Sequence, residues 1–308
     1  MTELPMKIQF RKTIKTSGMM EGVGLHSGEK LKLIFHPSES HTGIIFYQKS
    51  SNLKSSLIPA NVFSVIDTSL AVTLGNGSFF VQTVEHLMFA IFCLGITDML
   101  IEIQGSTEIP IADGSALPFI DTLEALEFHE YCDEILPIQI DKPIMVTDGD
   151  RYLVGLPHDQ FKISYSIDYP HPMLKDQALQ VEFEENFFKK EIGRARTFGF
   201  LKDVDYLKKN GLAQGGSTVN VLIFTPDKTL NESRFPQEPL YHKILDLVGD
   251  LALISKPIKG HILGSKGGHA LDVAFGKKLL REYESQLSEA EFKLIYSSPN
   301  EKIQTLVA

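Results

Sequence analysis

Three ionisable residues recur at four-residue intervals in the last third of the sequence: His242, Asp246 and Asp250. On a helix, positions i, i+4 and i+8 drift by only about 40° per step, so the three side chains share one stripe. Most of the remaining helix surface is apolar, through Ile244, Leu245, Leu247, Val248 and Leu251. Because imidazoles and carboxylates are costly to bury without a partner, the segment predicts a metal site on a buried helix.

A second pair of ionisable residues, Glu85 and His86, stands at the start of the apolar run 84–95. Two histidines and one carboxylate leave a tetrahedral zinc ion with one open position, the arrangement of a catalytic site. We therefore expect His86 to complete a ligand set with His242 and Asp246. Glu85 is about 100° around the helix from His86, where it could take a proton from a metal-activated water.

Hydrolysis of an amide or ester is the reaction that this set favours, and its leaving group needs a proton. His269 stands in the glycine-rich segment SKGGHAL (265–271), on a turn suited to proton donation. Asp250 would orient His269 or one of the metal ligands. Two other interpretations stay open, because HxxxD is also typical of surface ion pairs, and two histidines with a carboxylate also bind iron in oxygenases.

The composition limits the classes of partner. The 308 residues are 43% hydrophobic, enough for a substantial core, and carry a formal net charge of -9, which argues against a general electrostatic grip on nucleic acid or on an anionic membrane. The sequence has neither a signal-peptide pattern nor a run of roughly 20 apolar residues that would span a bilayer. We expect a cytoplasmic protein and a monomer, with Cys93 and Cys132 as reduced structural thiols.

The first third of the chain alternates apolar and polar residues as strands do. The predicted strands are 30–37, 43–48, 70–75, 78–83 and 99–104. The evenly apolar run 84–95 predicts a buried helix that Thr83 could cap and Gly95 could end. The stretch 113–128 is predicted to begin with a turn and to continue as a second, amphipathic helix.

Charge and proline interrupt this pattern around 130–144, and the second half then repeats the order of the first. Its predicted elements are strands within 138–185, helices at 186–195 and 202–210, a strand at 220–225, a long helix at 238–255, and a strand, turn and helix over 261–285. These runs predict an α+β fold of two similar domains, each a sheet with helices on one face, with the active site in the cleft between them. The domains would span 1–134 and 135–295, followed by a tail at 296–308.

Several motifs, in order, resemble the UDP-3-O-acyl-N-acetylglucosamine deacetylase family, the zinc amidases of bacterial lipid A synthesis. They are GVGLHSG (22–28), TVEHLMFAI (83–91), IPIADGSALPF (109–119), RARTFGF (194–200), GLAQGGS (211–217), RFPQEPLYHKILDLVGDL (234–251) and GSKGGHAL (264–271). The resemblance implies hydrolysis of the N-acetyl group of UDP-3-O-(3-hydroxyacyl)-N-acetylglucosamine with release of acetate, the committed step of lipid A biosynthesis. A non-catalytic nucleotide-sugar binding protein is the rival that keeps the ligand contacts without an activated water.

The resemblance also assigns roles at the site. The implied zinc ligands are His86, His242 and Asp246, with ferrous iron as an alternative metal. The implied catalytic residues are Glu85 as general base, His269 as general acid or cationic stabiliser, Asp250 behind it, and Thr197 as a hydroxyl that stabilises the oxyanion.

The implied partner is a UDP-linked acylated amino sugar. Lys243 and Lys266 match diphosphate-contacting positions, Tyr169 matches a position that stacks on uracil, and Phe198 falls in the same substrate-contacting segment. The stretch 199–225 matches an insertion that forms an apolar passage for the acyl chain. Binding such a substrate is compatible with transient contact with a membrane surface, without a membrane span.

Some positions depart from the family. Ala71 stands where some relatives carry a cysteine near the metal, so no thiol is needed here for metal capture. Prolines precede His242 where relatives are often helical, so we expect this helix to start near Pro239, a favourable first-turn residue. Arg151 replaces a common lysine and has no assigned role, and the apolar end IQTLVA (303–308) is either a protease-recognised tail or a disordered one.

Overall fold

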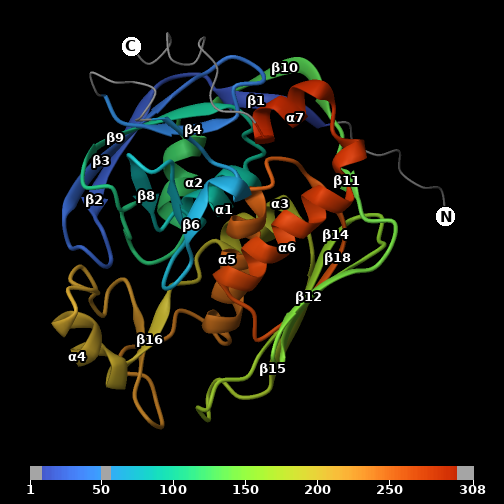
Figure 1. Ribbon diagram of the computed structural model, residues 1–308. Helices are drawn as coiled ribbons and strands as arrows, with labels where there is room; N and C mark the ends of the chain where they lie inside the picture. The colour runs from blue at the N-terminus through green and yellow to red at the C-terminus, as the bar shows by residue number, and fades with distance from the viewer. Residues whose placement is uncertain (1–8, 50–56, 297–308) are drawn as a thin grey trace.

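The computed structural model describes residues 9–49 and 57–296. Two main sheets lie towards opposite sides of the molecule, and helices fill the space between them (Figure 1). A single cluster of buried apolar side chains runs through both halves of the chain. In the described part of the chain, no helix is long and apolar enough to cross a membrane.

The first main sheet has five strands in the spatial order β2-β3-β9-β4-β5. Their bounds are Gly18–Val23 (β2), Lys30–His36 (β3), Ile44–Tyr47 (β4), Leu57–Pro59 (β5) and Met99–Gly105 (β9). Neighbours are antiparallel except β4 and β9, which run parallel. Leu31, Leu33 and Phe35 alternate with more exposed residues along β3, so this strand buries one face, as its sequence predicts.

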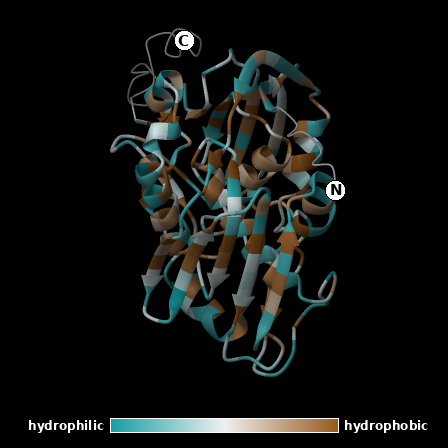
Figure 2. Cartoon of the chain, turned by 90° about the vertical axis from the view of Figure 1, so that its right-hand side faces the viewer, coloured by the Kyte–Doolittle hydropathy of each residue, from teal (hydrophilic) through white to brown (hydrophobic). Residues whose placement is uncertain are grey.

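The second main sheet repeats this topology, in the order β12-β13-β18-β14-β15, with β14 and β18 as the parallel pair. Its strands are Ile144–Asp148 (β12), Arg151–Leu156 (β13), Phe161–Ile167 (β14), Gln177–Glu182 (β15) and Ile258–Ser265 (β18), and the short β11 (Ile138–Gln139) also pairs with β18. Hydrophilic and hydrophobic residues alternate along the strands that face the viewer in Figure 2. The predicted repetition of element order is therefore present in the strand pairing.

Four helices form the layer between the sheets. They are α1 (Glu85–Cys93), α2 (Leu117–Glu124), α5 (Glu238–Ala252) and α6 (His269–Glu282). Helix α2 contacts both β2 and α1, α5 contacts β14, and α6 contacts β12 and β13, while α1 and α5 pack directly on one another. This arrangement confirms the predicted α+β class.

Smaller elements surround these layers. They are the pair β1 (Gln9–Ile14) and β10 (Phe128–Ile135), the sheet β6 (Val65–Asp67), β7 (Thr73–Gly75) and β8 (Phe80–Gln82), the parallel pair β16 (Phe198–Phe200) and β17 (Leu222–Phe224), and helices α3 (Glu185–Phe187), α4 (Leu201–Lys209) and α7 (Glu289–Tyr296). The end of β10 coincides with the predicted boundary at 134/135, which stays a prediction. The predicted tail lies, from residue 297 on, outside the described residues.

The turn predicted at the start of 113–128 is confirmed, because Asp113 accepts from Ser115, and the helix follows from Leu117. Two local predictions were wrong. Thr83 does not cap α1, because its φ of 62° is left-handed rather than extended, and its hydroxyl donates to Glu108 instead. The helix predicted over 186–195 is one turn followed by a π-turn at Phe188–Ile192.

Candidate active site

Two helices from different halves of the chain meet at the predicted site. A Cβ added at Gly249 of α5 would lie 2.1 Å from the carbonyl oxygen of Glu85 at the start of α1, so only glycine allows this approach. The contact sets the first turn of α1 opposite the ionisable stripe of α5. Segments more than a hundred residues apart in sequence thereby share one site.

The three predicted metal ligands are brought together and buried. One nitrogen or oxygen from each of His86, His242 and Asp246 lies within 4.8 Å of the others. Oδ1 of Asp246 is 3.3 Å from Nε2 of His242 and 3.8 Å from Nε2 of His86. Ligand atoms about 2.1 Å from a tetrahedral zinc ion are about 3.4 Å apart, so the two spacings from Asp246 are close to those of such an ion.

The protonation states of these groups suit metal binding. Burial, reinforced by the neighbouring His242, lowers the pKa of His86 to about 3, and burial also lowers the pKa of His242. Burial alone would raise the pKa of Asp246, but His242 and Lys243 outweigh it and lower that pKa well below its ordinary value. Two neutral imidazoles and one carboxylate are the forms that bind a divalent cation.

The orientation of His242 is fixed from behind. Its Nδ1 is 3.0 Å from the carbonyl oxygen of Ala195, which can only accept, so Nδ1 carries the proton and Nε2 keeps its lone pair. Such a contact sets the tautomer of a metal-binding histidine. The strand β16 thus helps to build the site, because Ala195 precedes it by only three residues.

Glu85 is placed as a buried acceptor beside the ligand group. Its Oε2 accepts a hydrogen bond from the backbone N–H of Val72 at 3.1 Å, and its Oε1 is 4.0 Å from Nε2 of His269. Burial raises its pKa to about 7, against the opposing effect of His269. A carboxylate with this pKa, next to a metal group, is suited to take a proton near neutral pH. The buried Ala71 precedes Val72, so the family's cysteine position also borders this acceptor.

His269 and Asp250 form a directed pair. Nδ1 of His269 lies 2.7 Å from Oδ2 of Asp250, which leaves Nε2 turned towards Glu85. His269 is the first residue of α6 and follows Gly268, while Asp250 is buried on α5. The predicted contact between the two residues is present, and the role of each stays a proposal.

The predicted substrate-binding residues fall into two groups. Tyr169 and Phe198 meet edge to face at 5.6 Å between ring centroids, and Phe198 is 6.3 Å from the ring of His242, so the aromatic pair adjoins the metal ligands. Lys243 forms a buried ion pair with Asp246 at 2.9 Å. Lys266 stands at the edge instead, with its Nζ near two carboxylates, 2.9 Å from Asp150 and 3.1 Å from Asp168.

The backbone N–H of Thr197 donates a hydrogen bond to the carbonyl oxygen of Gly114, and this contact holds the segment in place. Next to it, Arg196 is buried against Glu238 in a two-pronged ion pair, with Nε 2.9 Å from Oε1 and a terminal nitrogen 3.2 Å from Oε2. Arg196 therefore anchors the start of α5 and is already paired within the protein. Its partner Glu238 carried no signal in the sequence beyond its place at the start of the helix.

Asp272 is a further buried residue that sequence reasoning missed. It lies on the same face of α6 as His269, three residues later, and offers an oxygen within 4.8 Å of the ligand atoms of His269 and Asp250. The spacing of His269 and Asp272 was the signal that could have identified it.

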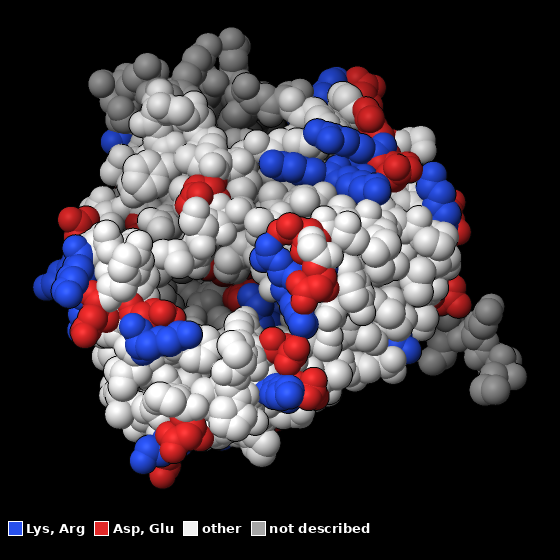
Figure 3. Space-filling view, turned by 60° about the horizontal axis from the view of Figure 1, so that its bottom comes forward, with Lys and Arg blue, Asp and Glu red and all other residues white. Residues whose placement is uncertain are grey.

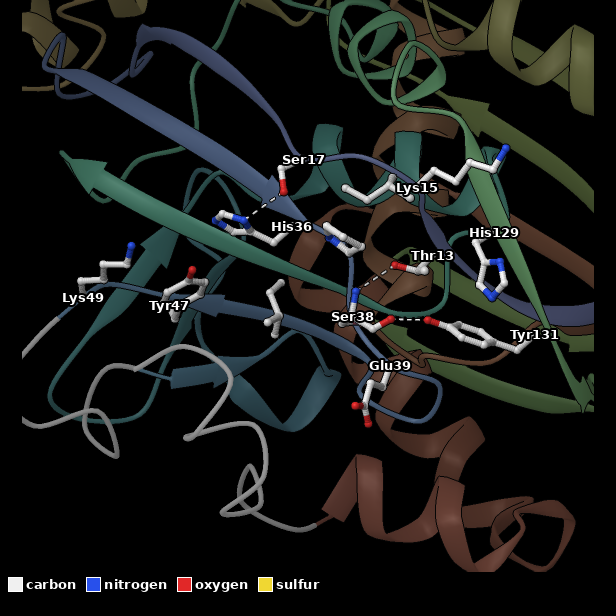
Figure 4. A pocket seen from close by; sticks show the side chains of 13 residues that line it. Thr13, Lys15, Ser17, His36, Ser38, Glu39, Tyr47, Lys49, His129 and Tyr131 are labelled. Atoms are coloured by element: carbon white, nitrogen blue, oxygen red, sulfur yellow. Dashed lines mark hydrogen bonds between the residues drawn. The ribbon is translucent and has the colours of Figure 1, made fainter.

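The surface is hollowed in two regions. Figure 3 shows a hollow on the face that comes forward from the bottom of Figure 1, with acidic and basic side chains around it. A second hollow of about 790 Å³ lies beside β3 and β10 and contains none of the predicted site residues (Figure 4). Several of its polar groups already have partners, since Lys15 pairs with Glu127, His36 with Ser17, and Tyr131 with the backbone of Ser38.

Comparison with known proteins gives one consistent result. A family model described as UDP-3-O-acyl N-acetylglycosamine deacetylase matches residues 11–281. A protein of Leptospira biflexa named UDP-3-O-acyl-N-acetylglucosamine deacetylase is 46% identical over 274 residues, which cover 88% of this chain and 90% of its own. Proteins with the same name from Thermodesulfovibrio yellowstonii and Syntrophus aciditrophicus are 40% and 37% identical, over 92% and 90% of this chain and 96% and 88% of their own. The chain therefore belongs to the UDP-3-O-acyl N-acetylglycosamine deacetylase family.

Proposed function

We propose that this protein is a zinc-dependent hydrolase that removes the acetyl group from a UDP-linked, 3-O-acylated N-acetylglucosamine. The observation that supports the proposal is the meeting of α1, α5 and α6, where three candidate metal ligands, a buried carboxylate and a histidine paired with Asp250 lie close together. Membership of the deacetylase family supports the substrate class. The products would be acetate and a free amine on the sugar.

A metal ion bound by His86, His242 and Asp246 would supply a Lewis acid that polarises the amide carbonyl and acidifies water. Glu85 would take the proton of the attacking water, as its raised pKa and the position of its Oε1 allow. His269, held by Asp250, would give a proton to the departing nitrogen. The C–N bond of the amide would break, the oxygen of the water would become part of acetate, and the amine would gain a proton.

The remaining contacts would bind and orient the substrate. The hydroxyl of Thr197 would donate to the oxyanion, from a segment adjoining His242 through Ala195 and Phe198. Tyr169 and Phe198 offer aromatic surface to the uracil, and Lys243 and Lys266 would turn from their carboxylate partners towards the diphosphate.

The acyl chain would follow the insertion at 199–225. On α4, Leu201 is 43% exposed, and Val204 and Leu207 are neither fully buried nor fully exposed. Apolar side chains that the core does not bury are available to line such a passage. This part of the proposal predicts that substitutions on α4 change preference for acyl length and leave acetate release from short-chain substrates intact.

The decisive experiment measures acetate release from the UDP-linked substrate, after chelation and after metal is restored. We expect activity to be lost on chelation, and to return with one zinc ion per chain. Return with ferrous iron alone, together with oxygen uptake, would favour an iron oxygenase. Tight binding of substrate by metal-loaded protein with no acetate released would favour a nucleotide-sugar binding protein.

A further inference from the structure

Asp272 presents an unusual buried carboxyl group behind the catalytic histidine. Its side chain is fully buried, and neither of its oxygens has a hydrogen-bond partner among the described residues. Oδ1 of Asp250 and the hydroxyl of Tyr165 are also buried, and neither has a hydrogen-bond partner among the described residues. Buried polar groups are nearly always hydrogen-bonded, so these four atoms call for a proton placed between them.

The charges around Asp272 oppose its ionisation. It faces Asp250 and Asp246 from α5, while Tyr165 faces it from β14. The positive groups within electrostatic reach are His269 on α6 and Lys243 on α5, but each already has a carboxylate partner at 2.7 Å or 2.9 Å. Burial and then the charge of Asp250 raise the pKa of Asp272 well above its ordinary value. Two adjacent carboxylates in such a site do not both ionise readily.

The geometry decides which carboxyl keeps the proton. Oδ2 of Asp250 accepts the Nδ1 proton of His269 at 2.7 Å, and this contact favours an ionised Asp250. Asp272 receives no comparable hydrogen bond from any described residue. We infer that Asp272 is a neutral carboxylic acid that donates a hydrogen bond to the free Oδ1 of Asp250 and so holds Asp250 against His269.

Gly267 leaves room for this network. A Cβ added there would lie 2.7 Å from the hydroxyl oxygen of Tyr165 and 3.3 Å from Oδ1 of Asp272, so both groups border the same small space. In this network Asp250 accepts two hydrogen bonds, one from the proton on Asp272 and one from Nδ1 of His269. Asp272 acts through Asp250 and is a positioning residue, an inference that rests on the proposed deacetylase function.

Two substitutions of Asp272 distinguish the effect of its hydrogen-bond donor from the effect of a negative charge at this position. Asp272→Leu keeps the approximate shape and removes the donor, and we expect kcat to fall about 10- to 100-fold with KM and metal content unchanged. Asp272→Asn keeps a donor and no charge, and we expect it to restore most of that loss. Equal losses in the two variants would overturn the inference. Urea unfolding of both variants identifies any loss that comes from misfolding.

The pH profile supplies a second test. Asn carries no charge, so if Asp272 is already neutral, Asp272→Asn leaves the alkaline limb of kcat where it is in the wild-type protein. If Asp272 is instead ionised, the substitution removes a negative charge beside His269. The alkaline limb would then move to lower pH by about one to three units. Such a shift would refute the neutral acid.

Infrared spectroscopy tests the proton directly and does not depend on activity. The wild-type protein should show the carbonyl band of a buried carboxylic acid, and Asp272→Asn should lack it. Absence of the band in the wild-type protein would overturn the inference even if acetate is released. Failure to release acetate, with the band present, would refute the proposed function and leave the protonation of Asp272 standing. Loss of a second metal ion in Asp272→Asn would show that a cation, and not a proton, occupies this cluster.

Discussion

Replacing Glu85 by Gln is the sharpest test of the proposed chemistry. Glutamine has nearly the same shape, and its carbonyl oxygen can still accept the hydrogen bond from Val72 that holds Oε2 at 3.1 Å. The side chain can therefore stay in place, but it no longer takes a proton. Loss of a general base typically slows turnover about 10²- to 10⁴-fold, which corresponds to about 2.7–5.4 kcal/mol in activation free energy.

The assay is acetate release at saturating substrate, with metal content measured on the same protein. We expect the kcat of Glu85→Gln to fall by the factor above while KM and metal stoichiometry stay close to the wild-type values, because the ligands are His86, His242 and Asp246. Glu102→Gln is a matched control, since Glu102 is another buried glutamate, bound to Tyr47 in the first sheet. Wild-type turnover by metal-loaded Glu85→Gln would refute the assignment of the base.

The pH dependence of kcat/KM also tests Glu85 as the base. Burial raises the pKa of Glu85 to about 7, and a base works only in its deprotonated form, so kcat/KM should rise with pH across an acid limb. A bound divalent cation favours the carboxylate and lowers this pKa, which puts the limb at or below pH 7. We expect the residual activity of Glu85→Gln to lack this limb.

Three further predictions concern the support of the site. His242→Ala should bind less than one metal ion per chain and lose most activity, and chelation should lower the melting temperature of the wild-type protein but not of this variant, as differential scanning calorimetry can show. Glu238→Ala leaves the guanidinium of Arg196 buried without a counter-charge and should cost about 3–5 kcal/mol in urea unfolding. Gly249→Ala forces α5 away from the facing carbonyl of α1, so the free energy of unfolding should fall by about 1–3 kcal/mol and kcat should fall as well. Gly276→Ala is the matched control and should cost less, because its Cβ would meet side-chain atoms no closer than 3.3 Å.

The sequence predicts the parts of the site that follow from local periodicity. A four-residue interval places His242, Asp246 and Asp250 on one stripe whatever the rest of the chain does, and α5 confirms a helix starting next to Pro239. The alternation in β3 and the even apolarity of α1 likewise identify their element types. These features depend on neighbours within a few residues, which a single sequence contains.

Contacts between distant segments could not be predicted in the same way. Asp272 is buried because α6 follows a tight turn onto Asp250, and apart from its three-residue spacing from His269 its own segment does not distinguish it from a solvent-exposed aspartate. The buried ion pair of Arg196 could not be predicted either, because its partner Glu238 is distant in sequence. The left-handed backbone of Thr83 is set by the packing around it, whereas a threonine before an apolar run in a sequence indicates a helix cap. These three cases each concern a polar residue whose partner or packing comes from elsewhere in the chain.

The net charge of the buried site connects the proposed metal ion with the proposed proton on Asp272, because both offset buried carboxylates. Four carboxyl groups and one ammonium group are buried together, from Glu85, Asp246, Asp250, Asp272 and Lys243. With neutral histidines these groups carry three negative formal charges, a large burden for an apolar interior. A divalent cation and one proton on Asp272 bring the sum to zero, and protonation of His269 then gives one positive charge as hydrolysis begins. That charge favours the oxyanion that develops, whereas an ionised Asp272 would cancel it. An acidic residue at this position is therefore compatible with the reaction when it holds its proton, and this is why the neutral asparagine is the informative substitution.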